Sequence, residues 1–471
     1  MSSPERYQLV VLGAGPGGYA AAFLAADLGL RVALVDTEEN PGGVCLYRGC
    51  IPSKALLHAA RVIREASAAR TMGIEFGAPR VSIEALRAWK DGVVKRLTSG
   101  VGQVSKFRKV AYLRGHGVLA DAHSMVVELH TGETQTVVFD HAVVATGSRP
   151  AALPMFDARS PRVLDSTTAL ELSGIPKTML VVGGGYIGLE LGSVYAALGA
   201  RVSVVEMLPG LLPGADRDLV AVLEKSIARH FERVMVNTRV VAAQEVAGGV
   251  HVTFEGAHTE EAIYEKVLVA VGRKPNTSGF GLENTRAKVD ERGFIAVDAQ
   301  RRTTEPSIFA IGDVTGEPML AHKASHEGRV AAEVIAGHKV AFEPAAIPAV
   351  IFTDPEIAWC GLTETQAKER GVEVSVAKFP WGASGRAMSI ERTDGLTKLM
   401  IDPKTERVLG VGVAGVGAGD MISEGALAIE MGALASDVKL TIHPHPTLSE
   451  TFMEAAEVFY GQSTHVYRPK R

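Results

Sequence analysis

Two cysteines separated by four residues, Cys45 and Cys50, are the clearest sign of chemistry in this chain. They follow a glycine-rich turn, and Pro52 suits the first turn of a helix, where its missing N–H donor would be unsatisfied anyway. Cys50 would then lie near a helix N-terminus, where the helix dipole and free backbone donors favour a thiolate. Because thiolates attack disulfides and pass electrons onward, the pair predicts a redox-active disulfide.

Two other interpretations of these cysteines are disfavoured. A structural zinc site usually needs four Cys or His ligands, and Cys360 is the one cysteine that remains, so no metal is expected. Inert buried thiols would not explain the flanking glycines or the charged Arg48 and Lys54, which are typical of a helix entrance at the edge of a cavity. Cys360 itself is expected to be a small core residue.

The composition limits the class of protein. A chain of 471 residues, 46% of them hydrophobic, predicts roughly three domains at about 150 residues each. The net charge of −4, with dispersed Lys and Arg, offers no basic stripe for nucleic acid and no polybasic run for a membrane. Three cysteines fit a reducing compartment, and no secretory or transit segment is expected before the first apolar run, so the cytoplasm is expected.

The first nucleotide-binding pattern begins close to the N-terminus. We expect a strand over 8–12, an alanine-rich helix to Leu28, and a second strand over 32–35 that ends at Asp36. The turn between strand and helix would use one glycine for the tight bend, one for close approach of a pyrophosphate and one for helix packing: Gly13, Gly15 and Gly18. Asp36 is placed to bind the adenosine ribose, so this βαβ unit predicts a dinucleotide site.

A second βαβ pattern follows in the middle of the chain. Strands are expected over 180–182 and 202–205 with a helix through 198, and the turn carries Gly183, Gly185 and Gly188. Glu206 ends the second strand and would bind ribose hydroxyls while repelling a ribose phosphate, and no arginine follows it in 207–209. NAD is therefore favoured over NADP. The alternative is that Glu206 is only a solvated carboxylate at the end of a strand.

These motifs, in this order, resemble the flavin-linked pyridine nucleotide–disulfide oxidoreductases over nearly the whole chain. The resemblance implies that the first unit binds FAD and the second NAD, and that 304–313 forms a second FAD motif in which Asp313 holds the ribitol. The segments 145–150 and 270–275 resemble the family's crossings between its FAD and NAD domains.

The fold class that the resemblance implies is α/β, with two Rossmann-like dinucleotide-binding domains, for FAD and NAD, and a C-terminal α+β dimerisation domain. The expected bounds are 1–150 and 277–345 for a split FAD-binding domain, 151–276 for the NAD-binding domain and 346–471 for the dimerisation domain. A homodimer is therefore expected.

The stretch 443–450 resembles the C-terminal signature of the dihydrolipoamide dehydrogenase branch of the family. The resemblance implies that His445 is the acid/base and that Glu450 orients it, with His443 the less favoured base. An imidazole can take a proton from an attacking dithiol while a carboxylate supports its charge. Without the resemblance, a histidine in a Pro-rich turn would more often be structural. In such dimers the histidine of one subunit completes the disulfide site of the other.

Further site residues follow from the same resemblance. Lys54 and Glu190 match positions that pair beside the flavin N5; the alternative is two unrelated surface charges. The remaining positions implied to contact FAD are Gly117, Thr146, Gly147, Gly312, Met319, Leu320, Ala321 and His322, and Gly272 is implied to contact NAD. Tyr47 and Arg48 depart from the Asn-Val of many relatives. Arg48 could lower a thiol pKa or meet the substrate and Tyr47 could pack on the flavin edge, or both could be neutral variation.

The resemblance implies an enzyme that oxidises protein-bound dihydrolipoamide through a Cys45–Cys50 disulfide and FAD and passes a hydride to NAD. The expected partner is a lipoyl-bearing acyltransferase or carrier protein of a 2-oxo acid dehydrogenase complex or of glycine cleavage, and no lipoyl domain is expected within the chain. The alternatives are a related NAD(P)H-dependent flavoprotein reductase of another disulfide, or a flavin-bound scaffold. Since no cysteine follows Cys360, reductases with a C-terminal thiol pair are disfavoured.

Overall fold

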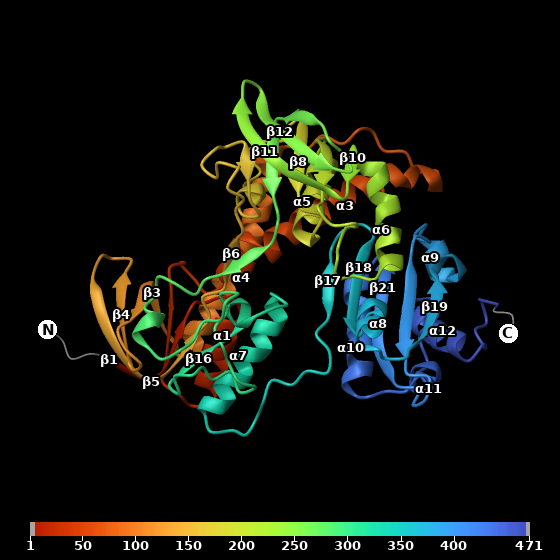
Figure 1. The fold of residues 1–471 in the computed structure, drawn as a ribbon. Helices are drawn as coiled ribbons and strands as arrows, with labels where there is room; N and C mark the ends of the chain where they lie inside the picture. Colours follow the sequence, from red (N-terminus) through yellow and green to blue (C-terminus); the bar gives the residue numbers. More distant parts are fainter. Residues whose placement is uncertain (1–4, 468–471) are drawn as a thin grey trace.

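The N-terminal sheet of the computed structural model, which describes residues 5–467, is built around a buried parallel strand (Figure 1). The central strand β1 pairs in parallel with β2 on one side and β5 on the other, and its apolar run 9–12 is buried, as expected for a strand covered on both faces. The strands of this sheet are β1 (Glu5–Leu12), β2 (Val32–Asp36), β3 (Ala111–Leu119), β4 (Ser124–Leu129), β5 (Thr134–Val144) and β16 (Ile308–Ala310).

Glycines allow two helices to pack closely against each other on this sheet. The helix α1 (Pro16–Asp27) follows the first turn, and α7 (Ala321–Ile335) lies beside it. A Cβ added to Gly328 of α7 would lie 2.4 Å from the carbonyl oxygen of Gly17, so only glycine permits this contact. Residues more than 300 positions apart are thereby brought to the same end of the sheet.

The second sheet repeats the βαβ arrangement. Its parallel strands lie in the order β10, β9, β8, β14, β7, and α5 (Tyr186–Ala197) follows β8. The bounds are β7 (Val163–Leu164), β8 (Thr178–Val182), β9 (Arg201–Val205), β10 (Arg233–Met235) and β14 (Lys266–Val269). An antiparallel sheet of β11 (Thr238–Val246), β12 (Gly249–Gly256) and β13 (Glu261–Tyr264) accompanies it. Both predicted βαβ units are confirmed.

The C-terminal sheet is antiparallel throughout, in the order β17, β18, β21, β20, β19 (teal to blue in Figure 1). Its strands are β17 (Ala349–Ile351), β18 (Glu356–Gly361), β19 (Ser375–Pro380), β20 (Leu396–Ile401) and β21 (Val408–Gly415). The helices of this region are α8 (Glu364–Arg370), α9 (Gly385–Ser389), α10 (Ala418–Glu430), α11 (Ala435–Leu440) and α12 (Glu450–Phe459). Cys360 is buried in the core of this sheet, which confirms the prediction made for it.

The remaining helices connect these layers. They are α2 (Gly43–Arg48), α3 (Cys50–Ala68), α4 (Ile83–Phe107) and α6 (Arg217–His230), with 3₁₀ turns at Ala69–Met72, Thr168–Glu171, Leu282–Asn284, Gly312–Thr315 and Trp381–Ala383. Within residues 5–467, no helix combines the length and the apolar character that crossing a membrane requires.

Apart from the sheet of β6 (Ser148–Pro150) and β15 (Arg273–Pro275), each sheet draws its strands from a single predicted domain, and the N-terminal sheet combines both segments of the split one. The strands β6 and β15, which pair with each other, lie at the two expected crossings. The residue-level domain boundaries stay a prediction.

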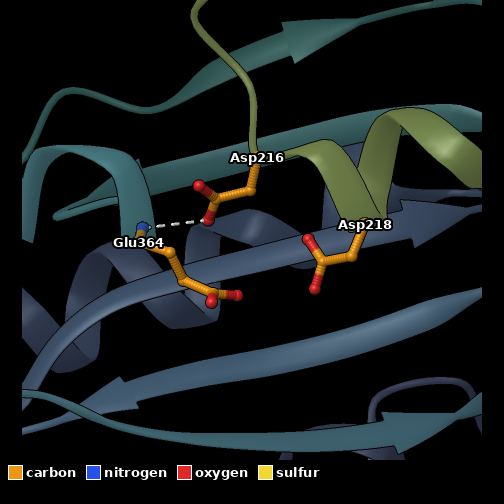
Figure 2. Close-up of side chains that lie close together, drawn as sticks. All are labelled: Asp216, Asp218 and Glu364. Atoms are coloured by element: carbon orange, nitrogen blue, oxygen red, sulfur yellow. Dashed lines mark hydrogen bonds between the residues drawn. The ribbon is translucent and has the colours of Figure 1, made fainter. Parts of the chain in front are cut away.

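A partly buried ion cluster joins the second sheet's α6 to the C-terminal sheet. Asp216, Asp218 and Glu364 point their carboxylates toward a common space (Figure 2). The Lys398 ammonium lies among them, 2.7, 2.9 and 2.5 Å from the three carboxylates, and the side chain is 0% exposed. Lys378 also pairs with Asp218 and Glu364, at 2.7 and 3.1 Å. The place that a cation would take is filled by lysine ammonium groups.

The lysines hold two of these carboxylates in the ionised form. Burial acts to raise the pKa of Asp218 and of Glu364, but hydrogen bonds from Lys398 and Lys378 outweigh burial, and both pKa values are lowered from 3.8 and 4.5. The stabilisation from these groups is therefore present above pH 3.8 and 4.5 and is lost as the pH falls through the lower values of the folded protein.

Removing the central lysine breaks its ion pair with the buried Asp216 and leaves Asp218 and Glu364 with Lys378 alone. We predict that Lys398→Met lowers the free energy of unfolding by about 3 to 5 kcal/mol at neutral pH, the usual cost of breaking a buried pair, and by less in acid. Thermal unfolding across pH measures this. Lys404→Met is the control, because Lys404 makes only an exposed, 4.0 Å pair with Glu373. Equal unfolding midpoints for the two variants would show that the cluster contributes no stability.

Candidate functional site

A cavity of about 420 Å³ lies where the first nucleotide turn, the start of α3 and the start of α5 meet. Thirteen of the site residues predicted from the sequence line it: Gly13, Gly15, Asp36, Cys45, Cys50, Lys54, Thr146, Gly147, Glu190, Gly312, Asp313, Met319 and Ala321. A second cavity, of about 310 Å³, shares Gly13, Asp36 and Thr146 with the first and is also lined by Gly117. Because the two cavities share lining residues, together they form a long site suited to an extended ligand.

The first glycine turn leaves open space at one position only. A Cβ on Gly13 would lie 2.3 Å from the carbonyl oxygen of Ala145, and one on Gly18 would lie 1.8 Å from that of Gly13. Gly15, by contrast, has no atom within 4 Å of where its Cβ would be. Gly15 therefore exposes bare backbone to the cavity at the N-terminus of α1, where a phosphate group fits.

The second turn repeats this arrangement. A Cβ would clash at Gly183, 2.5 Å from the Ala270 carbonyl oxygen, and at Gly188, 2.3 Å from that of Gly183. Gly185 again has nothing within 4 Å, and Gly272, at φ +112°, also faces open space. Two cradles of the same shape thus precede α1 and α5.

The acidic residues that end the second strands brace these turns. Asp36 accepts hydrogen bonds from the backbone N–H groups of Ala14, at 2.6 Å, and Glu38, at 3.0 Å. Glu206 accepts from those of Gly184 and Leu208, at 2.7 and 2.8 Å, and is 8% exposed. The alternative interpretation of Glu206 as a solvated carboxylate is therefore wrong. Sequence reasoning did not find this bracing role.

The redox cysteines lie at a helix junction beside the cavity. Cys45 belongs to α2, and Cys50 is the first residue of α3; both are free thiols here. A hydrogen bond from Cys45, together with the charge of Lys54, outweighs burial and lowers the pKa of Cys50 to about 7, while the same hydrogen bond and burial raise the pKa of Cys45. Cys50 is therefore the thiolate of the pair.

Lys54 is held by groups from two other parts of the chain. Its ammonium lies 2.8 Å from the carboxylate of the buried Glu190, on α5, so these are not separate surface charges. The same ammonium lies 4.5 Å from the centre of the Phe352 ring, and the Phe352 backbone N–H donates to Glu190 at 2.9 Å. Phe352, just after β17, was not singled out from the sequence, where nothing marks its contact with Lys54.

The turn that carries Asp313 is supported by a buried charge network. Ser148 donates to Asp313 at 2.5 Å, and Arg273 donates to Ser148 at 2.7 Å. The fully buried Glu327 accepts from the backbone N–H of Gly312 at 2.6 Å and pairs with Arg301 and Lys323 at 2.9 and 3.2 Å. These supporting residues were also missed, since their charges come from separate segments.

Three predicted FAD contacts do not line either cavity within residues 5–467: Gly18, Leu320 and His322. Gly18 serves helix packing, and Leu320 caps the start of α7. His322 contacts the carbonyl oxygen of Pro348 through Nε2, at 2.8 Å.

His445 and Glu450 form a pair away from the cysteines. His445 Nδ1 lies 2.9 Å from Glu450 Oε1, and the histidine side chain is 77% exposed. Burial opposes ionisation of Glu450, but hydrogen bonds from the Thr447 N–H and His445 prevail and lower its pKa. Among residues 5–467, the side chains that line the cysteine cavity do not include His445 or Glu450.

The two unusual residues between the cysteines contact the loop after β2. Tyr47 shares hydrogen bonds of 3.1 Å with the backbone of Asn40, and Arg48 pairs with Glu38 at 2.5 Å. Lys54, rather than Arg48, supplies the positive charge that lowers the pKa of Cys50.

The family model described as pyridine nucleotide-disulphide oxidoreductase matches residues 7–328 of this chain, and the dimerisation domain of the same family matches residues 347–456. The chain belongs to the pyridine nucleotide-disulphide oxidoreductase family.

Similar proteins agree with this assignment over full length. The dihydrolipoyl dehydrogenase of Haemophilus influenzae is 49% identical over 471 residues, covering 100% of this chain and 98% of that protein. The one of Thermus scotoductus is 46% identical, covering 98% and 99%. The crystal structure of LpdA from Mycobacterium tuberculosis superposes with a TM-score of 0.89 at 28% identity, covering 97% and 99%.

As a member of the pyridine nucleotide-disulphide oxidoreductase family, the chain is a flavoprotein that uses FAD and NAD(H). The residues present fit both cofactors. Open backbone at Gly15 and Gly185 gives each pyrophosphate a cradle, and the long double cavity beside Cys50 gives the flavin a place.

The thiol assignment predicts a pH-dependent reaction. In protein reduced with a phosphine, Cys50 should react with iodoacetamide faster than Cys45, with a midpoint near pH 7, because the thiolate is present above that pH and lost below it. Lys54→Met should raise the midpoint, since the ammonium is lost and Glu190 is left unpaired. Peptide mapping of the alkylated protein measures both effects. Arg61→Met, in an exposed pair on the same helix, is the control, and faster labelling of Cys45 would contradict the assignment.

The two open glycines allow the cofactor sites to be tested separately. Gly15→Ala should fold but retain less FAD, and Gly185→Ala should keep its FAD but raise the KM for NAD, because each added methyl occupies one cradle. We expect a loss of about 1 to 3 kcal/mol, or about 5- to 150-fold in affinity. The flavin-to-protein absorbance ratio and NAD titrations measure the two effects, and each variant is the control for the other. Loss of FAD from both variants would contradict separate sites.

Proposed function

We propose that this protein is a dihydrolipoyl dehydrogenase, which oxidises a dihydrolipoyl group and reduces NAD. The observation that carries the proposal is the combination, in a chain similar over full length to enzymes of that name, of a paired Cys45–Cys50 with a paired His445–Glu450. A scaffold protein would need neither pair.

The two cysteines have different roles in the reaction. One thiol of the substrate attacks Cys45 Sγ of the disulfide, and Cys50 leaves as the thiolate that the positive charge of Lys54 favours. The second substrate thiol then attacks the mixed disulfide, releasing the oxidised substrate and the reduced cysteine pair. FAD, when bound, supplies the acceptor for the electron pair, which reaches NAD as a hydride.

The base for these steps comes from a second copy of the chain. His445 is exposed, paired with Glu450, and lies in the region that matches the family's dimerisation domain. We assign the proton transfer to the partner subunit's His445, with the ionised Glu450 holding the imidazole in orientation. One chain then provides the thiols and its partner the base.

The proposal extends to location and partners. The substrate would be a lipoyl group on a separate acyltransferase or carrier protein of a 2-oxo acid dehydrogenase complex or of glycine cleavage. The enzyme would act in the cytoplasm. The domain bounds would be 1–150 with 277–345, 151–276 and 346–471, since each sheet apart from that of β6 and β15 draws its strands from one of these domains.

The proposed base is tested by His445→Gln. We expect lipoamide-dependent NADH formation to fall by about 10²- to 10⁴-fold, the usual contribution of a positioned acid/base, while NADH-driven dye reduction is retained. The two assays on one preparation, with NADP in place of NAD as a further arm, measure this. Undiminished lipoamide turnover would refute His445 as the base. Wild-type protein that reduces dye but not NAD with dihydrolipoamide would point to another disulfide substrate.

A further inference from the structure

The segment that carries His445 is held to the rest of the fold through a second histidine. Between α11 and α12, the side chains of residues 441–446, all of which the structure describes, are exposed except that of His443, which is 4% exposed. This inward-pointing ring connects the segment to another helix, whereas the Thr441 hydroxyl donates to the Asp437 carbonyl oxygen of the neighbouring α11.

Both nitrogens of the His443 ring face hydrogen-bond acceptors. Nδ1 lies 2.9 Å from the carbonyl oxygen of Thr441, and Nε2 lies 2.7 Å from Oε1 of Glu424, on α10. A carbonyl oxygen and a carboxylate can only accept, so both ring nitrogens must carry a proton for both hydrogen bonds to form. The two contacts are therefore best satisfied by an imidazolium.

The charges around His443 favour that state. Glu424 faces the ring from α10 and Glu450 from the start of α12. The hydrogen bond to Glu424 and these negative charges outweigh burial and raise the pKa of His443 above 6.5. The proton is therefore held at neutral pH more firmly than on a free histidine.

Downstream of His445, the segment has a separate anchor. The Thr447 N–H donates to Glu450 at 2.8 Å, through the carboxylate oxygen that His445 does not use. His445 thus sits between two fixed points, one at Glu424 and one at Glu450.

We propose that His443, as an imidazolium bound to Glu424, is a positioning residue that fastens the 441–447 segment to α10 and so presents His445 to its reaction partner. The catalytic role of His445 rests on the proposed function, whereas the attachment of the segment to α10 by His443 does not. As the pH rises through the pKa of His443, the ring loses a proton and one of its two hydrogen bonds, and the anchor weakens.

Two substitutions distinguish the effect of the charge on His443 from the effect of its two hydrogen bonds. His443→Phe keeps a buried ring but removes both hydrogen bonds. In Glu424→Gln, the amide can donate to Nε2 while Nδ1–H donates to Thr441, so a neutral His443 keeps both hydrogen bonds and the pH dependence disappears. His251→Gln is the control, because His251 forms another His–Glu pair, with Glu261, on β12 and β13 and outside the C-terminal region.

Hydrogen exchange in the holoenzyme tests the anchor without any assay of activity. After correction for intrinsic rates, peptides covering 441–447 should exchange faster at pH 9 than at pH 6 in the wild type and in His251→Gln. They should exchange fast at both pH values in His443→Phe, and slowly at both in Glu424→Gln. Wild-type protection in His443→Phe would overturn the proposal.

Turnover tests the positioning of His445. His443→Phe should lower kcat with dihydrolipoamide by about tenfold to a hundredfold, the cost of a misplaced catalytic group, while dye reduction and the KM for NAD stay unchanged. Faster exchange with undiminished kcat would overturn the positioning role. If wild-type protein lacks lipoamide turnover, the proposed function fails, and the exchange pattern still decides whether His443 is the anchor.

Discussion

The contact of Lys54 with Glu190 and Phe352 is the constraint on which the rest of the site depends. These three residues come from α3, α5 and the start of the C-terminal sheet, and they meet beside Cys50. An ammonium in this place is stabilised by a carboxylate and an aromatic face and in turn favours the Cys50 thiolate. The electrostatics of the thiol therefore require the N-terminal, middle and C-terminal parts of the chain to be docked together.

The local elements of this fold could be predicted from the sequence because their causes are local. Alternation of apolar strand, glycine turn and helix specifies both βαβ units, and Pro52 after the cysteines marks the start of a helix. Family resemblance added the convergence of Asp313, Thr146 and the cysteines on one cavity, which no spacing in the chain encodes.

What could not be predicted is mostly the support behind the site. Phe352, Glu327 and Lys398 are ordinary residues in sequence, and each acquires its role only from charges that the tertiary fold brings to it. Glu327 and Lys398 are buried charges beside opposite charges, and Phe352 supplies an aromatic face to the charge of Lys54. These contacts depend on packing rather than on pattern. Glu206 illustrates the same limit. The sequence predicts its position at the end of a strand, but it does not predict the two backbone hydrogen bonds that its carboxylate accepts.

The separation of the exposed His445 from the cysteine cavity has a genetic consequence under the proposed pairing of subunits. A chain with a damaged thiol and a chain with a damaged imidazole each form inactive homodimers, but a mixed dimer contains one site in which both groups are intact. Two defective alleles could then restore partial activity to each other, whereas two alleles damaged in the same group could not. Complementation between the two alleles would thus show that the two active sites of a dimer work independently.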